Sequence, residues 1–217
     1  MKPIITPTVF VSSSSALQER LELYEEMAAR VQLDVADEEF TPKPTLGVEK
    51  MLEVATTPER DVHLMTVEPA EWLEVCKIEG VKTAIGQIEN MSSQKEFVEE
   101  AKRLNLRVGL GVDLETDLKE LDWLTAKEAD LILIMAVRAG KEGQKFNKES
   151  LVRVQELRKR GFAKEICVDG GVNEQTIGKC VKAGADVLAV GSCLWQAEDI
   201  KVEFKRLTQL AERASTS

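Results

Sequence analysis

Short apolar segments alternate along the whole chain with longer segments whose apolar residues recur at helical spacing. The apolar segments are rich in Val, Ile and Leu at consecutive positions, which is typical of parallel strands buried on both faces. The pattern predicts strands over residues 4–11, 30–35, 61–66, 81–86, 106–112, 130–137, 165–168 and 186–190. It predicts helices over residues 16–29, 48–55, 70–77, 93–104, 116–121, 148–160, 174–183 and 197–214. This alternation indicates a parallel sheet covered by helices.

The number of predicted strands and the length of the chain together favour a barrel. The chain has 217 residues, of which 43% are hydrophobic, and no low-complexity linker interrupts it. A barrel of eight strand–helix units needs about 200 to 250 residues. We therefore expect an α/β fold of the (β/α)8 TIM-barrel type, formed as one domain by residues 1–217.

Charge and hydropathy narrow the classes of partner. The formal net charge is −9, whereas proteins that bind nucleic acid or anionic membranes use clustered Lys and Arg. The first residues do not form a signal peptide, and no apolar run approaches the length of a membrane span. We expect a cytoplasmic protein with neither nucleic acid nor membrane as partner, whose bound phosphate belongs to a small molecule.

Two neighbouring strand ends carry turns suited to a phosphate. The strand at residues 165–168 runs into Asp169, Gly170 and Gly171, and the next strand runs into Gly191 and Ser192. Glycine turns expose backbone N–H groups, which bind phosphate oxygens. The sequence therefore predicts a phosphate site at these two ends with a carboxylate beside it.

Other strands place polar side chains at the same end of the predicted barrel. Gln32 and Asp34 point the same way from the second strand, and His63 lies on the third. An Asp inside an apolar strand costs several kcal/mol to bury unless it is paired, hydrogen-bonded or bound to a metal. Together with Asp169 these groups predict a site for a hard or borderline divalent ion. The alternative is a hydrogen-bonded network that is purely structural.

Four segments, in this order, resemble the ribulose-phosphate 3-epimerase family. They are VQLDVADEEFTP at residues 31–42, DVHLM at 61–65, GKEGQKF at 140–146, and VDGGV at 168–172 with VGS at 190–192. Single segments such as VDGG also occur in other phosphate-binding barrels, but the four in order are specific for the fold of this family. The resemblance covers nearly the whole chain and implies a (β/α)8 barrel of the ribulose-phosphate-binding type.

The resemblance implies an isomerase that inverts C3 of D-ribulose 5-phosphate to give D-xylulose 5-phosphate. By similarity, Asp34 and Asp169 are the two bases that transfer protons on opposite faces of an enediolate. One divalent ion, Zn, Fe, Mn or Co, would be held by Gln32, Asp34, His63 and Asp169 and would polarise the oxygens on C2 and C3. The partner is a small phosphosugar, and the family often forms homo-oligomers.

The same resemblance implies contacts with the sugar and its phosphate. The residues concerned are Met65, Met135, Gly140, Gly143, Gly170, Gly171, Gly191 and Ser192. The segment 140–143 would belong to a loop that closes over the substrate.

Several positions depart from the family pattern. Gln32 stands where the family has a metal-binding histidine, and a neutral amide oxygen is the weaker ligand for zinc or iron. Val11 replaces a serine on the first strand, although Ser12 could restore the hydroxyl through a shift in register. Strand four reads TAIGQ and lacks the usual polar signature, and the sixth loop gains Arg138 and Lys141.

These departures leave two alternatives to the leading interpretation. In one, the protein is an epimerase or isomerase of another phosphosugar, with Arg138 and Lys141 binding a different group. In the other, it is a catalytically degenerate barrel that binds phosphosugars. Exchange of substrate hydrogen with solvent deuterium separates the enzymes from the binding protein, which would show only thermal stabilisation by sugar phosphates.

Overall fold

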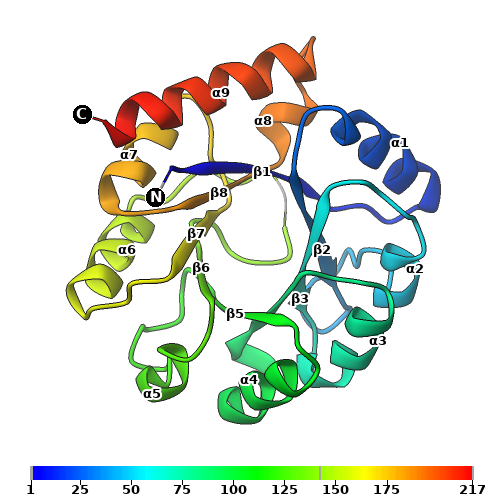
Figure 1. Cartoon of the computed structure of the whole chain (residues 1–217), viewed down its shortest axis with the longest axis vertical. Helices are drawn as coiled ribbons and strands as arrows, with labels where there is room; N and C mark the ends of the chain where they lie inside the picture. Colours follow the sequence, from blue (N-terminus) through cyan, green and yellow to red (C-terminus); the bar gives the residue numbers. More distant parts are fainter. Residues whose placement is uncertain (1, 142, 217) are drawn as a thin grey trace.

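The eight predicted parallel strands close into one barrel, which confirms the expected fold. The computed structural model describes residues 2–141 and 143–216. Each strand pairs in parallel with the next, and β1 pairs with β8 to complete the ring (Figure 1). The strands are β1 (Ile4–Val9), β2 (Arg30–Ala36), β3 (Glu59–Met65), β4 (Thr83–Gln87), β5 (Arg107–Val112), β6 (Leu131–Met135), β7 (Glu165–Asp169) and β8 (Val187–Val190).

Helices surround the barrel and carry the chain from one strand to the next. They are α1 (Ser14–Glu25), α2 (Val48–Leu52), α3 (Leu73–Ile78), α4 (Gln94–Arg103), α5 (Trp123–Ala126), α6 (Glu149–Lys159), α7 (Ile177–Ala183), α8 (Ser192–Trp195) and α9 (Ile200–Ser215), with the short 3-10 helices η1 (Pro69–Trp72) and η2 (Ile88–Asn90). Most of these lie where the hydrophobic pattern predicts them. The short helix α8, directly after β8, was not predicted.

The predicted helix over residues 116–121 is wrong. This segment forms turns, and the helix α5 begins later, at Trp123. Asp117 accepts a hydrogen bond from the backbone N–H of Lys119, and Asp122 caps α5 by accepting one from Leu124. Short Asp side chains satisfy nearby backbone donors in this way and so compete with helix formation, which the apolar spacing alone does not reveal.

Two apolar layers explain why the strands are hydrophobic on both faces. Alternate residues of each strand point outward and pack against the helices; on β2 these are Val31, Leu33 and Val35. The other set points into the barrel, where a second cluster is buried. It comprises Ala36, Met65, Ile85, Leu131, Leu133, Met135, Val137, Ala139, Cys167, Val187 and Ala189. The outer layer holds the helices in place and the inner layer fills the barrel.

Buried charges lie inside the barrel where several strands begin. Arg30 contacts the carboxylate of Asp61, and its Nη1 lies 3.0 Å from Glu165 Oε2, which is also 3.0 Å from Nη2 of Arg107. Arg30 and Asp61 are 6% and 1% exposed. Burial raises the pKa of Asp61 even with Arg30 beside it, so the ionised carboxylate depends on this cation.

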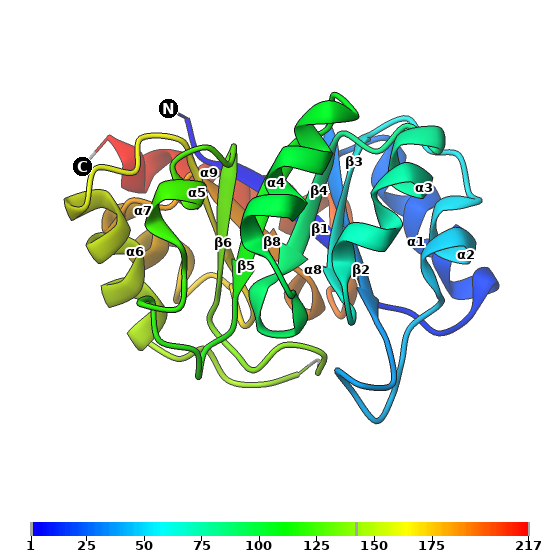
Figure 2. The ribbon, with the colours of Figure 1, turned by 90° about the horizontal axis from the view of Figure 1, so that it is seen from below.

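The opposite end of the barrel carries the loops that follow the strands. In Figure 2 the segments after β2 and β6 extend from one end, whereas both termini lie toward the other. Side chains at the carboxyl ends of the strands therefore converge on the loop-bearing face, where barrels of this kind place their sites. In the described part of the chain, no helix combines the length and the apolar character needed to cross a bilayer.

Replacing Arg30 tests whether the buried carboxylate of Asp61 depends on the guanidinium of Arg30. Arg30→Met leaves Asp61 without its ion-pair partner, whereas Glu165 keeps Arg107, and removing one partner of a buried ion pair costs about 3–5 kcal/mol. We expect that loss in the free energy of unfolding measured with urea. Arg206→Met is the control, because Arg206 pairs with Glu174 at the surface and such pairs contribute about 1 kcal/mol or less. Equal losses in the two variants would contradict the interpretation.

Candidate active site at the carboxyl end of the barrel

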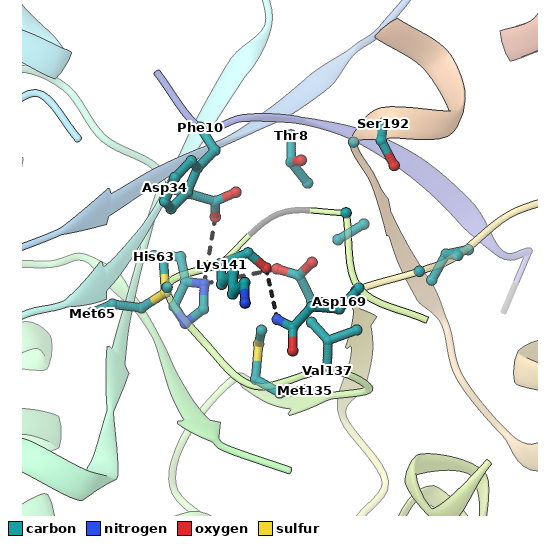
Figure 3. A pocket seen from close by; sticks show the side chains of 18 residues that line it. Thr8, Phe10, Asp34, His63, Met65, Met135, Val137, Lys141, Asp169 and Ser192 are labelled. Carbon is teal, nitrogen blue, oxygen red and sulfur yellow. Dashed lines mark hydrogen bonds and ion pairs between the residues drawn. The ribbon is translucent and has the colours of Figure 1, made fainter. Parts of the chain in front are cut away.

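One cavity at the loop-bearing end gathers nearly all of the predicted site residues (Figure 3). Those that line it are Asp34, His63, Met65, Met135, Gly140, Gly143, Asp169, Gly170, Gly171, Gly191 and Ser192. Thr8, Phe10 and Lys141 also line it, among others. Only Gln32 of the predicted set is absent from the lining, because it lies beneath the carboxylates and is 1% exposed.

Two carboxylates and one imidazole meet on the floor of this cavity. Asp34 and His63 are paired across β2 and β3, and Asp169 ends β7. Nδ1 of His63 lies 3.4 Å from Oδ1 of Asp34 and 3.7 Å from Oδ2 of Asp169, as the dashed lines in Figure 3 indicate. One potential ligand atom from each residue lies within 4.8 Å of the others. The barrel thus brings together three groups that are far apart in the sequence.

The orientation of His63 is set from strand β4. The amide nitrogen of Gln87 donates to Oε2 of Glu89 at 3.0 Å, which turns Oε1 of Gln87 toward Nε2 of His63 at 3.1 Å. The imidazole therefore carries its proton on Nε2 and leaves the Nδ1 lone pair facing the carboxylates. Nδ1 is buried and has no hydrogen-bond partner among the described residues.

The contribution of strand four was missed in the sequence, where TAIGQ was interpreted as lacking the usual polar signature of the family. Gln87 is fully buried and touches His63 from the end of that strand. Space for it comes from Gly111 on β5, since a Cβ there would overlap Oε1 of Gln87 and lie 3.3 Å from Nε2 of His63. A glycine inside an apolar strand is a signal of such a close approach. Gly111 lies within VGLGV at residues 108–112, so the sequence contained this signal.

Gln32 bridges the two carboxylates from below. Its amide nitrogen donates to Oδ1 of Asp34 at 2.8 Å and to Oδ2 of Asp169 at 2.6 Å. In this orientation Gln32 presents its N–H groups, not its oxygen, to the centre of the site. Ligation of an ion by its amide oxygen, as the sequence predicts, requires the amide to turn.

The site holds two acidic groups and one basic group close together. Burial, together with the nearby charge of Asp34, raises the pKa of Asp169 to about 7. Burial alone lowers the pKa of His63, but its contact with Asp34 and the charge of Asp169 raise it overall. A cation between the carboxylates would relieve this repulsion.

The donor set fits a divalent ion. It offers one unprotonated imidazole nitrogen and two carboxylates, from Asp34 and Asp169, with His63 held by a second hydrogen bond on its far side. Borderline ions such as Zn, Fe, Mn and Co accept this mixture of nitrogen and oxygen ligands. Nδ1 of His63 makes no hydrogen bond among the described residues and faces one oxygen of each carboxylate, an arrangement that three ligands of one ion require.

The expectation that strand one loses its hydroxyl at Val11 is wrong. Strand β1 ends at Val9, and Val11 packs in the outer apolar layer, while Ser12 is exposed. Side chains alternate between the two faces of a strand. Val9 and Val11 therefore point outward, whereas Thr8 and Phe10 line the cavity. The hydroxyl that faces a ligand from this strand is therefore that of Thr8.

The glycines at the far side of the cavity are required by the backbone. Gly171 has a φ of 64°, and a Cβ there would lie 2.7 Å from the backbone nitrogen of Phe146. The turn after β7 therefore packs against the segment that follows β6. The two predicted phosphate-binding turns and this segment form one wall of the cavity.

The loop after β6 contributes a cation. Lys141 lines the cavity, whereas Arg138 is exposed and does not line it. Ala139 anchors the start of the loop by donating to Oδ1 of Asp113 at 3.1 Å. Glu142, within the predicted closing segment 140–143, lies outside the described residues, and closure of the loop stays a prediction.

Comparisons with known proteins identify the family and the fold of the chain. The family described as "Ribulose-phosphate 3 epimerase family" matches residues 4–195. A ribulose-phosphate 3-epimerase of Eremothecium gossypii is 30% identical, over 93% of this chain and 90% of the relative. The cytoplasmic isoform of ribulose-phosphate 3-epimerase from Oryza sativa subsp. japonica is 31% identical, over 77% of this chain and 75% of the relative. A solved structure of KGPDC from Streptococcus mutans shares the fold, with a TM-score of 0.78, 10% identity and 99% of both chains covered.

Gln87 can be tested as the residue that orients His63. Gln87→Leu removes the acceptor for Nε2–H, so the lone pair of Nδ1 is no longer directed at the carboxylates. Loss of such a partner typically lowers metal affinity about 10- to 100-fold, and we expect that change in the dissociation constant for Mn²⁺ measured by calorimetry. Gln175→Leu, at an exposed position after β7, should leave the constant unchanged. Unaltered Mn²⁺ binding by a folded Gln87→Leu protein would refute this role.

Proposed function

Because the chain belongs to the ribulose-phosphate 3-epimerase family, we propose that it interconverts D-ribulose 5-phosphate and D-xylulose 5-phosphate by inverting C3. The observation that carries the proposal is the pair of buried carboxylates on β2 and β7 that share one cavity floor with His63. Epimerisation needs a base on one side of the carbon and an acid on the other, and two carboxylates on different strands can supply them.

Asp34 and Asp169 would divide the proton transfer between them. One carboxylate removes the proton from C3, which leaves an enediolate, and the other delivers a proton to the opposite face. The raised pKa of Asp169, about 7, supports this assignment, because a group that exchanges protons near neutral pH works best with a pKa near that value. In the reverse reaction the two residues exchange roles.

A divalent ion, Zn, Fe, Mn or Co, would be held by Asp34, His63 and Asp169, with Gln32 joining through its oxygen after the amide turns. Bound there, it supplies Lewis acidity that polarises the carbonyl and hydroxyl oxygens next to the reacting carbon. The chain contributes the orientation of the ligands. Gln87 holds the imidazole in the required tautomer, and the apolar layer beneath excludes water from it.

The rest of the cavity would bind the two ends of the substrate. Met65 and Met135 offer apolar contact beside the reacting carbons. The phosphate would lie against the backbone of Gly143, Gly170, Gly171, Gly191 and Ser192, with Gly140 in the covering loop. Lys141 lines the same cavity, and its charge would favour a dianionic ligand.

Three further properties belong to this proposal. Residues 1–217 would work as one domain, supported by the closure of all eight strands into one barrel. A cytoplasmic location is supported by the cytoplasmic isoform among the relatives. Homo-oligomer formation stays a prediction from the family resemblance.

Lys141 also favours a second candidate, in which the same proton transfer acts on a different phosphosugar. A lysine at the cavity rim could select an additional anionic or hydroxyl group on a longer sugar. The catalytically degenerate alternative is distinguished from both enzymes by thermal stabilisation with sugar phosphates in the absence of proton exchange.

The two-base mechanism predicts the behaviour of Asp169→Asn. The amide can neither accept nor deliver the C3 proton, and loss of a general acid–base group lowers rates about 10²- to 10⁴-fold. We expect conversion of ribulose 5-phosphate to xylulose 5-phosphate, followed by NMR with Mn²⁺ present, to fall by that factor. Asp117→Asn, in an exposed turn, should convert the substrate at the wild-type rate. Absence of conversion by the wild-type protein with Mn, Fe, Co and Zn would contradict the proposed function.

The role of Lys141 predicts an effect on binding more than on chemistry. Lys141→Met removes a cation from the rim, and a charge-assisted contact is worth about tenfold in affinity or slightly more. We expect KM for the phosphosugar to rise about tenfold while kcat changes less. Lys145→Met tests the same loop at an exposed residue outside the cavity lining and should behave as wild type. A loss confined to kcat would exclude this role.

A further inference from the structure

The side-chain amide of Gln32 hydrogen-bonds to the same carboxylate oxygens that a bound ion would contact. Its amide nitrogen donates to Oδ1 of Asp34 and Oδ2 of Asp169. Those are the two oxygens that approach Nδ1 of His63 most closely, at 3.4 and 3.7 Å. An ion bound to Nδ1 would reach the carboxylates through these oxygens, so the N–H groups of Gln32 and the ion have the same acceptors.

Chemistry makes an amide suited to this position. One amide nitrogen carries two hydrogens, so a single atom can serve two carboxylates at once. Gln32 is almost fully buried, and hydrogen bonds to buried carboxylates are among the strong ones because the acceptor is charged. Turning the amide through half a revolution exchanges its donor face for an oxygen, which is an acceptable ligand for a hard or borderline ion.

We propose that Gln32 is an internal substitute for the cation in the ion-free protein, a positioning residue that holds Asp34 and Asp169 in place until an ion displaces its N–H groups. The inference rests on the ion site of the proposed function. It has two consequences for this chain. The pocket stays assembled without an ion. Each ion that binds must first break two hydrogen bonds, which lowers the affinity of the site for the ion.

Gln32→Met separates this role from that of a simple ligand, because methionine keeps the length of the side chain but cannot donate. Without ions, after treatment with a chelator, the two carboxylates of the variant repel each other with no donor between them. We expect its melting temperature to fall by about 5 °C or more below that of the wild type, from the loss of two charge-assisted bonds. With saturating Mn²⁺ the difference should shrink, since the ion replaces the lost donors.

The affinity for Mn²⁺ gives the second readout. The variant loses a neutral amide oxygen, which is a weak ligand, but it has no hydrogen bonds to break, so its dissociation constant, measured by calorimetry, should equal or be lower than that of the wild type. Gln18→Met is the matched control, because Gln18 also donates to a carboxylate, that of Glu22, but at the surface. It should change neither the melting temperature nor the Mn²⁺ affinity. An ion-free Gln32→Met protein as stable as the wild type, or one that binds Mn²⁺ more weakly, overturns the proposal.

A measurement on the wild-type protein keeps the test decisive if the variant does not fold. In protein labelled with ¹⁵N at glutamine side chains, the amide of Gln32 should give protons that exchange slowly with solvent when no ion is bound. Addition of diamagnetic Zn²⁺ should shift this signal strongly as the amide turns, and an unshifted signal overturns the proposal. None of these readouts requires turnover. Failure of the epimerase assignment and failure of this inference are therefore distinguishable.

Discussion

The mutual repulsion of two buried carboxylates, Asp34 and Asp169, is the constraint on which this site depends. Two neighbouring carboxyl groups that are buried cannot both ionise without a cost in free energy. The raised pKa of Asp169 reflects this cost. Two neighbouring side chains reduce the free-energy cost of ionising both carboxyl groups. Gln32 donates to both carboxylates, and His63 turns an available nitrogen toward them. The same electrostatic demand creates an attraction for a cation and a readiness to exchange protons.

The barrel supports this arrangement by keeping its two ends chemically separate. At the amino end, Arg30 and Arg107 neutralise Asp61 and Glu165 within the barrel. An apolar layer follows, and only then come the groups of the candidate site. The charges at the amino end pair with one another. Among the described residues, Asp34 and Asp169 have His63 as the basic group beside them, and they lie at the end that opens onto the loops.

Positioning of the imidazole shows how a departure from a family pattern can be accommodated. Gln87 and Glu89 orient His63 from β4, and Gly111 on β5 leaves the space that they need. None of these three residues would take part in chemistry. Their joint effect is to decide which nitrogen of His63 faces the carboxylates. A barrel strand can thus contribute to a site through the neighbour of a functional residue rather than through that residue itself.

The sequence by itself determined the order of the strands, the closed barrel and most of the residues that line the cavity, because strand periodicity and polar strand ends are local features. It could not determine what happens between strands. Val11 was assigned to the pocket in error, since the end of β1 and hence the face of each residue depends on pairing with β2 and β8. The helix expected at 116–121 was lost to side-chain hydrogen bonds of aspartates. Only the tertiary structure decided that Gln87 touches His63 and that Gln32 directs its nitrogen to both carboxylates, because these contacts join residues from different strands and depend on the stagger of the closed sheet.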